Sequence, residues 1–282
     1  MFLLNQERYK LINLQLSLFG LRSLVIKMDN YYNQKVELAA AFRWTARLDM
    51  HESVVNHFSL SVDDDSSKFL VNPGCLHFSL IKASDLILVD INNIQQSISH
   101  IDEDNKPLET ALDLHGSIHR KNKKARCILH VHSKFATIVS TFKNKNGNNK
   151  WKGCIPPIDQ NTMRFYNRVS IDNNYDGIAK GKEAERISAK IGNNNILLLG
   201  NHGPMVIAPS VAKAFYDLYY FEKACETYVR AASTGCELEI LSDEIAEKTA
   251  KQMENYKPSN VADLYFKSLL KILDNENSDY KN

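Results

Sequence analysis

The sequence predicts an α/β fold in which helices cover both faces of a mixed β-sheet. Two observations lead to this fold class. Segments with the two-residue alternation of strands interleave along the chain with segments that have the period of amphipathic helices. Hairpin turns join some of the predicted strands and helices separate others, so the sheet should be mixed.

The first part of the chain contains one clear helix and a hairpin. Residues 36–48 carry apolar side chains at helical spacing with alanine between them. Residues 58–62 then alternate apolar residues with serine, an Asp-rich turn follows, and residues 69–71 precede an Asn-Pro-Gly breaker, which is typical of a hairpin. Two more strands are expected at residues 86–91 and 94–98.

The rest of the chain alternates between short strands and helices. Ser133 and Ser210 each stand where a serine hydroxyl caps the start of a helix. The expected helices are 111–121, one from Ser133, 181–191, 210–233, 242–254 and 260–272; the expected strands are 126–132, 196–199 and 205–208, with a loop at 143–157.

Composition excludes several classes of protein. The chain has 282 residues, of which 44% are hydrophobic and 24% charged, as in an ordinary soluble protein that can bury one substantial core. Charges of both signs are interspersed and sum to +2, so no nucleic-acid partner is indicated. The five cysteines are scattered without a paired motif, which is typical of a reducing compartment, so a cytoplasmic location is expected.

The N-terminal segment is expected to stand apart from the principal domain. Residues 11–26 are fairly apolar but include Asn13, Gln15 and Arg22, so neither a signal peptide nor a membrane span fits, and no membrane partner is expected. The regular helical pattern begins only after Met28, which is a candidate for the true start. An N-terminal helix packed on a neighbour is the alternative for these first residues.

The domain boundaries follow from these patterns. We expect an extension over 1–34, the principal domain over 35–240, and C-terminal helices with a polar tail over 241–282.

Three histidines form a candidate metal site. His130 and His132 follow an apolar run, and alternate residues of a strand point to one face. Imidazole is the commonest metal ligand among side chains and suits zinc, iron, copper or nickel. His202, between two glycines at the end of an apolar strand, is the natural third ligand. Hydrogen-bonded histidines near a sheet edge are the alternative for the pair.

With these positions assembled, the chain resembles the class II aldolase and adducin head-domain family. The resemblance rests on the histidine-bearing segments 114–120, 127–133 and 199–203, and it covers about residues 35–235. It implies a three-layer α/β/α sandwich with a central mixed, mostly antiparallel sheet.

The resemblance also implies a divalent metal held by His130, His132 and His202. Zinc is the first expectation, with Fe²⁺ or Mn²⁺ as alternatives. Three neutral imidazoles leave a coordination position open, where a metal can polarise a carbonyl or hydroxyl group. Because family aldolases often form a fourfold ring, a homotetramer with active sites near subunit boundaries, acting on a small-molecule substrate, is implied.

One segment departs from the family pattern. Sugar-phosphate aldolases of the family carry Ser-Ser-Glu ending four residues before the position of His115, and this chain has Glu109-Thr110-Ala111 there. A carboxylate would repel a phosphate, so the usual phosphorylated ketose is not expected. Glu109 could act as the catalytic base if the backbone slips by two residues, and Asp113 competes with it. An ordinary helix start is the alternative for both carboxylates.

Other residues are assigned proton transfer or substrate binding. His115 and His119 share a helix face that leads into the histidine strand. His119 is expected to donate a proton or to hydrogen-bond a metal ligand; a structural histidine is the alternative. Asn56 and Asn72 match the family's substrate-anion loops, and Glu222 on the long helix could hydrogen-bond a metal ligand.

A polar segment after the Pro-Pro turn suits the rim of a pocket. Gln160, Asn161 and Tyr166 could orient a substrate there, with Tyr166 a candidate catalytic residue. Arg164 or Arg168 could bind a carboxylate. A solvated loop that caps a short helix is the alternative.

The leading functional hypothesis is a metal-dependent lyase of the aldolase, decarboxylase or dehydratase type, acting on a small hydroxy- or oxo-acid or a related carbonyl compound. Three histidines with open positions also suit an Fe(II)-dependent oxygenase. A non-catalytic interaction module of the adducin type is the third reading.

Overall fold

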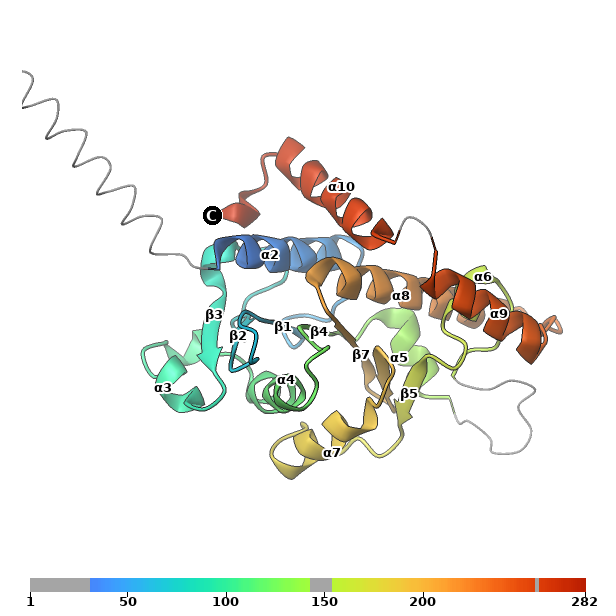
Figure 1. Ribbon diagram of the computed structural model, residues 1–282, viewed down its shortest axis with the longest axis horizontal. Coiled ribbons are helices and arrows are strands. Elements are labelled where there is room, and N and C mark those ends of the chain that lie inside the picture. The colour runs from blue at the N-terminus through green and yellow to red at the C-terminus, as the bar shows by residue number, and fades with distance from the viewer. Residues whose placement is uncertain (1–30, 143–153, 257–258) are drawn as a thin grey trace, which may run out of the picture. The chain divides into compact units, whose positions relative to one another are not determined.

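The computed structural model describes residues 31–142, 154–256 and 259–282, and it contains a single sheet with helices on both sides (Figure 1). The predicted fold class is therefore confirmed. The predictions for residues 1–30, and most of the predicted loop at 143–157, lie outside the described residues.

The sheet has seven strands in the order β3-β2-β1-β4-β7-β6-β5. They are β1 (His57–Ser61), β2 (Lys68–Val71), β3 (Ile87–Asp90), β4 (Cys127–His130), β5 (Val169–Asp172), β6 (Ile196–Leu199) and β7 (Gly203–Ala208). Strands β5 and β6 pair in parallel, and every other neighbouring pair is antiparallel. The sheet is therefore mixed and mostly antiparallel, with β4 at its centre.

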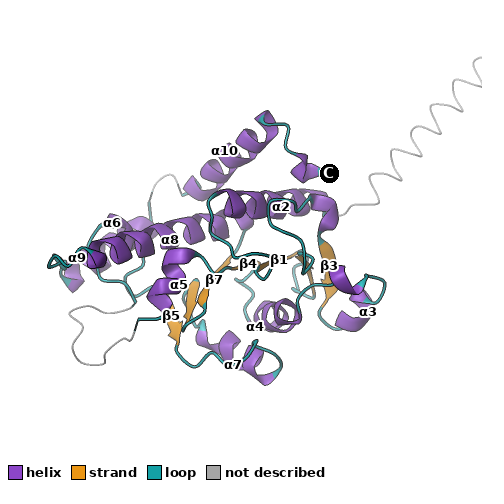
Figure 2. Cartoon of the chain, turned by 180° about the vertical axis from the view of Figure 1, so that it is seen from behind, coloured by secondary structure: helices purple, strands orange, loops and turns teal. Residues whose placement is uncertain are grey.

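The helices surround this sheet. They are α2 (Tyr32–Arg47), α3 (Ile94–Ile98), α4 (Gly116–Lys121), α5 (Lys134–Ser140), α6 (Gln160–Arg164), α7 (Lys182–Lys190), α8 (Val211–Ser233), α9 (Asp243–Glu254) and α10 (Val261–Asn275). A π-helical segment, η3 (Ala111–His115), leads into α4, and short 3-10 turns occupy Ala83–Asp85, Glu103–Asn105 and Asp279–Lys281. Figures 1 and 2 show α2 and α8 on one side of the sheet and α4 and α7 on the other.

Alternation along the strands divides the core between these two sides. Ile128, Leu197 and Met205 belong to one buried cluster together with Ile118 of α4 and Ile187 of α7. Alternate residues of a strand face opposite ways, so His130 lies on the same face as Ile128. The sheet thus presents His130 toward the side that carries α4.

The C-terminal helices pack against the rest of the chain. Helix α9 contacts α6, and α10 contacts α8. The Trp44 indole of α2 donates a hydrogen bond to the Leu269 carbonyl of α10, 3.1 Å away. Residues 35–282 form one compact unit that includes both helices. No described helix has the length and apolar character needed to cross a membrane.

One predicted strand is a helix. Residues 94–98, expected as a strand, form α3, so this prediction is wrong. Ile94 and Ile98 pack into the same apolar cluster, and residues four apart share a face in a strand as well as in a helix, so their spacing did not distinguish the two. The Ser97 hydroxyl donates to the Asn93 carbonyl and closes the turn that starts this helix.

One strand was not predicted. In the edge strand β5 three partly exposed residues precede the buried Asp172, so its sequence lacks the apolar run of the inner strands. Arg186 makes two hydrogen bonds to the Asp172 carboxylate, at 2.7 and 3.1 Å. This ion pair lets a charged residue occupy a buried strand position.

Candidate metal centre

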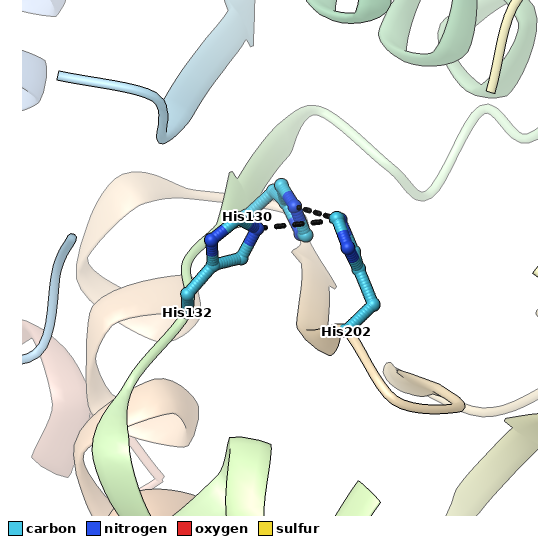
Figure 3. Close-up of side chains that lie close together, drawn as sticks. All are labelled: His130, His132 and His202. Atoms are coloured by element: carbon cyan, nitrogen blue, oxygen red, sulfur yellow. Dashed lines mark hydrogen bonds between the residues drawn. The ribbon is translucent and has the colours of Figure 1, made fainter. Parts of the chain in front are cut away.

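The three histidines predicted as metal ligands lie together (Figure 3). Nε2 of His202 is 3.1 Å from Nε2 of His130 and 3.3 Å from Nε2 of His132. Nitrogens bound to one tetrahedral zinc ion at its usual bond length lie about 3.3–3.4 Å apart. The three ring nitrogens are therefore spaced to bind a single ion.

The opposite ring nitrogens of two of these histidines hold hydrogen bonds. Nδ1 of His130 donates to the Pro204 carbonyl at 3.1 Å. Nδ1 of His132 donates to the Glu52 carboxylate at 2.6 Å. A proton on Nδ1 leaves the Nε2 lone pair free, which is the tautomer that a metal ligand needs. Glu52 was not predicted, because nothing in the local sequence around it indicates a contact with a histidine 80 residues away.

A tight turn brings His202 to the end of β4. Asn201 adopts a left-handed conformation with φ of 54°, and the amide of His202 donates to the Leu199 carbonyl. A Cβ atom on Gly203 would lie 2.5 Å from the Val131 carbonyl oxygen, so only glycine allows this close approach. The Tyr175 ring stacks on His202 at 4.1 Å between centroids, another contact that the sequence did not indicate.

Burial keeps two of the site histidines, His130 and His202, neutral. The pKa of His130 is lowered well below its usual value, first by burial and then by the neighbouring histidines. Burial, followed by the charge of His132, lowers the pKa of His202 to about 4. Neutral imidazole is the form that binds a metal, so these residues are ready to bind without releasing a proton.

A fourth histidine lies against the cluster. His57 stands directly opposite His130 in the register of β1 and β4, and the two rings are 4.9 Å apart. Cross-strand neighbours share a face, which explains the contact. His57 Nδ1 is 2.8 Å from His115 Nε2, so the contacts continue into η3.

His119 is separated from the cluster by three intervening residues, Ser59, His115 and His57. Its Nε2 is 2.8 Å from the Ser59 hydroxyl, which is 2.7 Å from His115 Nδ1, and its own Nδ1 donates to the Ala125 carbonyl. Burial lowers the pKa of His119 to about 4. His115 and His119 do share a helix face, as expected, but that face meets Ser59 and His57. The structure therefore does not bring His119 to the candidate metal ligands.

The two other predicted catalytic residues also lie away from the cluster. Glu109 is exposed and pairs with Lys180. Tyr166 is buried between α6 and α9, where burial and Asp243 raise its pKa to about 12. None of the contacts described for these two side chains reaches a site histidine. Asp113, the competing carboxylate, accepts a hydrogen bond from the Gly181 amide.

The two predicted substrate-binding asparagines differ in whether their side-chain NH₂ group has a hydrogen-bond partner. Asn56 accepts hydrogen bonds from the backbone amides of Glu52 and His132, and its buried Nδ2 has no partner among the described residues. Asn72 accepts from the Phe58 amide, and its own amide nitrogen donates to the carbonyls of Asn56 and Pro73. Only Asn56 therefore keeps a free donor, and that donor belongs to a side chain bonded to the His132 amide.

The other predicted substrate-binding residues lie elsewhere. Gln160 and Arg164 line a cavity of about 680 Å³ with no histidine in its lining. Asn161 lies on the same short helix but does not line the cavity. Arg168 pairs with Glu247 and Glu254 of α9. The polar segment after the Pro-Pro turn therefore lies at this cavity and against α9, and none of its residues named here lines the histidine cluster.

Comparison with known proteins agrees with this geometry. The family described as class II aldolase and adducin N-terminal domain matches residues 36–229. A crystal structure of an aldolase II superfamily protein from Pseudomonas syringae is similar at a TM-score of 0.77, with 27% identity over 89% of this chain and 96% of that one.

Two curated relatives carry different names. An adducin-related protein of Schizosaccharomyces pombe is 28% identical over 90% of this chain and 78% of its own length. A 4-hydroxy-3-prenylphenylpyruvate oxygenase/4-hydroxy-3-prenylbenzoate synthase of Streptomyces roseochromogenus is 23% identical over 81% of this chain and 79% of its own length. Proteins with enzyme names and proteins with adducin-related names therefore both resemble this chain.

Proposed function

The chain belongs to the class II aldolase and adducin N-terminal domain family, and from that premise we propose that it is a metal-dependent lyase. Its substrate is a small hydroxy- or oxo-acid or a related carbonyl compound, and its reaction is of the aldolase, decarboxylase or dehydratase type. The observation that carries this proposal is the convergence of three Nε2 atoms, with two of the opposite Nδ1 atoms already hydrogen-bonded.

The donor set fits a catalytic ion better than a structural one. Among the described residues the cluster comprises three histidines, whereas structural zinc sites are normally closed by four protein ligands. A divalent ion, zinc in the first place and Fe²⁺ or Mn²⁺ as alternatives, supplies Lewis acidity to a substrate oxygen when bound.

Residues around the cluster have roles to match. Glu52 holds the Nδ1 proton of His132 and so fixes the orientation of that ring. The unpartnered Nδ2 of Asn56 donates a hydrogen bond to a substrate oxygen. Burial, and then Glu183, raises the pKa of Tyr175, so its hydroxyl stays protonated beside His202 and can donate a proton.

The proposal also covers the location, the assembly and the partners of the protein. The protein acts in the cytoplasm as a homotetramer with active sites near subunit boundaries, on small molecules and without nucleic-acid or membrane partners. Light scattering on the purified chain measures the subunit number.

Metal content and turnover test the proposal together. Elemental analysis of the native protein should give about one divalent ion per chain, and His202→Ala should lose it. Tyr175→Phe should keep the ion and lower turnover on a panel of hydroxy- and sugar acids. If the ion is present but no panel member reacts, and its removal changes only thermal stability, the ion is structural and the lyase proposal is wrong.

An oxygenase is the second candidate, because the Streptomyces relative carries that name and three histidines also hold Fe(II). Anaerobic reconstitution with Fe(II), followed by substrate-dependent oxygen uptake, separates it from a lyase. An adducin-like interaction module needs none of the three histidines. Native protein that contains no metal would therefore favour the module.

A further inference from the structure

The cavity lined by Gln160 and Arg164 lies at the opposite end of strand β6 from the histidine cluster. Its volume is about 680 Å³, and its lining includes Ile196, the first residue of β6. Strand β6 ends at Leu199, just before the turn that carries His202. Because β5 runs parallel to β6, Arg168, which precedes β5, lies at the same end and also lines the cavity. The cavity and the cluster are therefore separated by the length of the strand.

Aromatic and amide side chains shape this cavity. Helices α6, α8, α9 and α10 all contribute to its wall. The aromatic lining residues are Phe165, Tyr216, Tyr220 and Tyr256. The backbone before β6 adds three consecutive asparagines, 193–195. A volume in this range suits a small organic molecule, since ligand pockets measure roughly 300–1,000 Å³.

Among the described lining residues, Arg164 is the charged side chain that has donors without a strong acceptor. Its guanidinium carbon lies 4.2 Å from the Tyr220 ring centroid and 5.3 Å from that of Tyr216. One terminal nitrogen contacts the Met253 sulfur at 3.8 Å, and a thioether is a weak acceptor. The Nε atom is buried and has no acceptor among the described residues. A buried donor without a partner costs free energy unless a ligand satisfies it.

The other charged groups of the lining are already paired. Arg168 bonds to Glu247 and Glu254, and Lys213 pairs with Asp217. Among the described lining residues three cations, Arg164, Arg168 and Lys213, stand against two carboxylates, Asp217 and Glu254, so the lining carries a net charge of +1. The cavity therefore favours a ligand with a single negative charge.

We propose that this cavity is a binding site for a small aromatic carboxylate, separate from the histidine cluster. The planar guanidinium matches a carboxylate with two parallel hydrogen bonds, and the ligand's ring packs among the tyrosines. A phosphate would bring a second negative charge close to Asp217 and Glu254, and the resulting repulsion disfavours it.

Titration calorimetry with benzoate on the full-length protein tests this site. Benzoate should bind saturably, and Arg164→Gln should raise the Kd about tenfold or more, because glutamine lacks both the charge and the two parallel donors. Arg164→Lys keeps the charge but lacks the fork and should weaken binding less than Arg164→Gln does, a graded loss that a folding defect would not follow. The matched control is Arg230→Gln, an exposed arginine of α8 outside the cavity, which should leave the Kd unchanged.

Two further arms distinguish the site from alternatives. His202→Ala should bind benzoate as the wild type does, because no histidine lines the cavity. Loss of benzoate binding in His202→Ala, or no saturable binding to the wild type, overturns the proposal of a separate site. Inorganic phosphate should bind more weakly than benzoate; tighter Arg164-dependent binding of phosphate would show that the assigned ligand class is wrong.

Discussion

Glu222 of α8 should stabilise the segment that follows the candidate metal ligands. Its carboxylate accepts hydrogen bonds from the Ser133 hydroxyl at 2.6 Å, the Phe135 amide at 2.8 Å and the Ala136 amide at 3.0 Å. These groups form the start of α5, directly after His132. Ser133 was predicted to cap this helix with its own hydroxyl; instead that hydroxyl donates to Glu222, and the carboxylate satisfies the helix amides.

The magnitude follows from what Glu222→Gln removes. The glutamine oxygen can replace only one carboxylate oxygen, so its NH₂ group must face a donor, the Phe135 amide. A buried amide left unsatisfied costs about 1–3 kcal/mol, and the lost negative charge at a helix start adds about 0.3–1 kcal/mol. We therefore expect Glu222→Gln to lower the free energy of unfolding by about 1–4 kcal/mol.

Denaturant unfolding followed by circular dichroism measures this change. The matched control is Glu226→Gln, one turn further along α8, where the carboxylate forms surface ion pairs with Lys223 and Arg230. Such exposed pairs contribute about 0–1 kcal/mol. If the two variants lose the same free energy within about 0.5 kcal/mol, the Glu222 contacts do not stabilise α5 as argued.

Three further predictions concern other parts of the chain. Gly203→Ala places a Cβ 2.5 Å from a backbone carbonyl oxygen just past the end of β4, so it should lower metal affinity at least about tenfold in a chelator competition; unchanged affinity would show that the turn can yield. His119 has a folded-state pKa of about 4, below its unfolded value, so the unfolded state gains the proton first and stability should fall as pH drops from about 6.5 toward 4. The fall should be smaller in His119→Gln, and equal slopes in unfolding experiments would contradict the assignment. Arg186→Gln leaves the buried Asp172 carboxylate without its bidentate partner and should lower the free energy of unfolding by about 2–4 kcal/mol. The exposed control Arg230→Gln should lower it by less than about 1 kcal/mol. Equal losses in the two variants would show that the Asp172 pair contributes no more than a surface pair.

The sequence predicted the parts of the fold that carry a strong apolar pattern. The inner strands β4 and β6 have uninterrupted buried runs, and α8 begins where Ser210 indicated, with the serine oxygen accepting the Lys213 amide. The edge strand β5 and the short helix α3 lack such a pattern. Their structure depends on contacts with distant residues, which periodicity does not record.

The same distinction applies to the candidate site. His130, His132 and His202 each lie at or just after the end of a buried strand, so strand geometry was enough to bring them together. Glu52 and Tyr175 reach the cluster from irregular segments whose spacing carries no information about partners. Helical spacing placed His115 and His119 on one face but could not show that this face meets Ser59. Residue type and spacing indicated a shared face, and only the tertiary contacts identified the partners.

The turn that carries His202 gives the three histidines unequal freedom. His130 belongs to a central strand that is hydrogen-bonded on both sides. His132 follows two residues later, and its ring is held by a hydrogen bond to the Glu52 carboxylate. His202 sits on a turn outside the ladder, so it is the member of the set that can adjust when ions of different radius are exchanged. Crystal structures with zinc and with manganese should therefore superimpose at β4 and differ at the turn, residues 200–202. The range of ions that the centre accepts would then depend on the three residues of this turn, while β4 keeps its position.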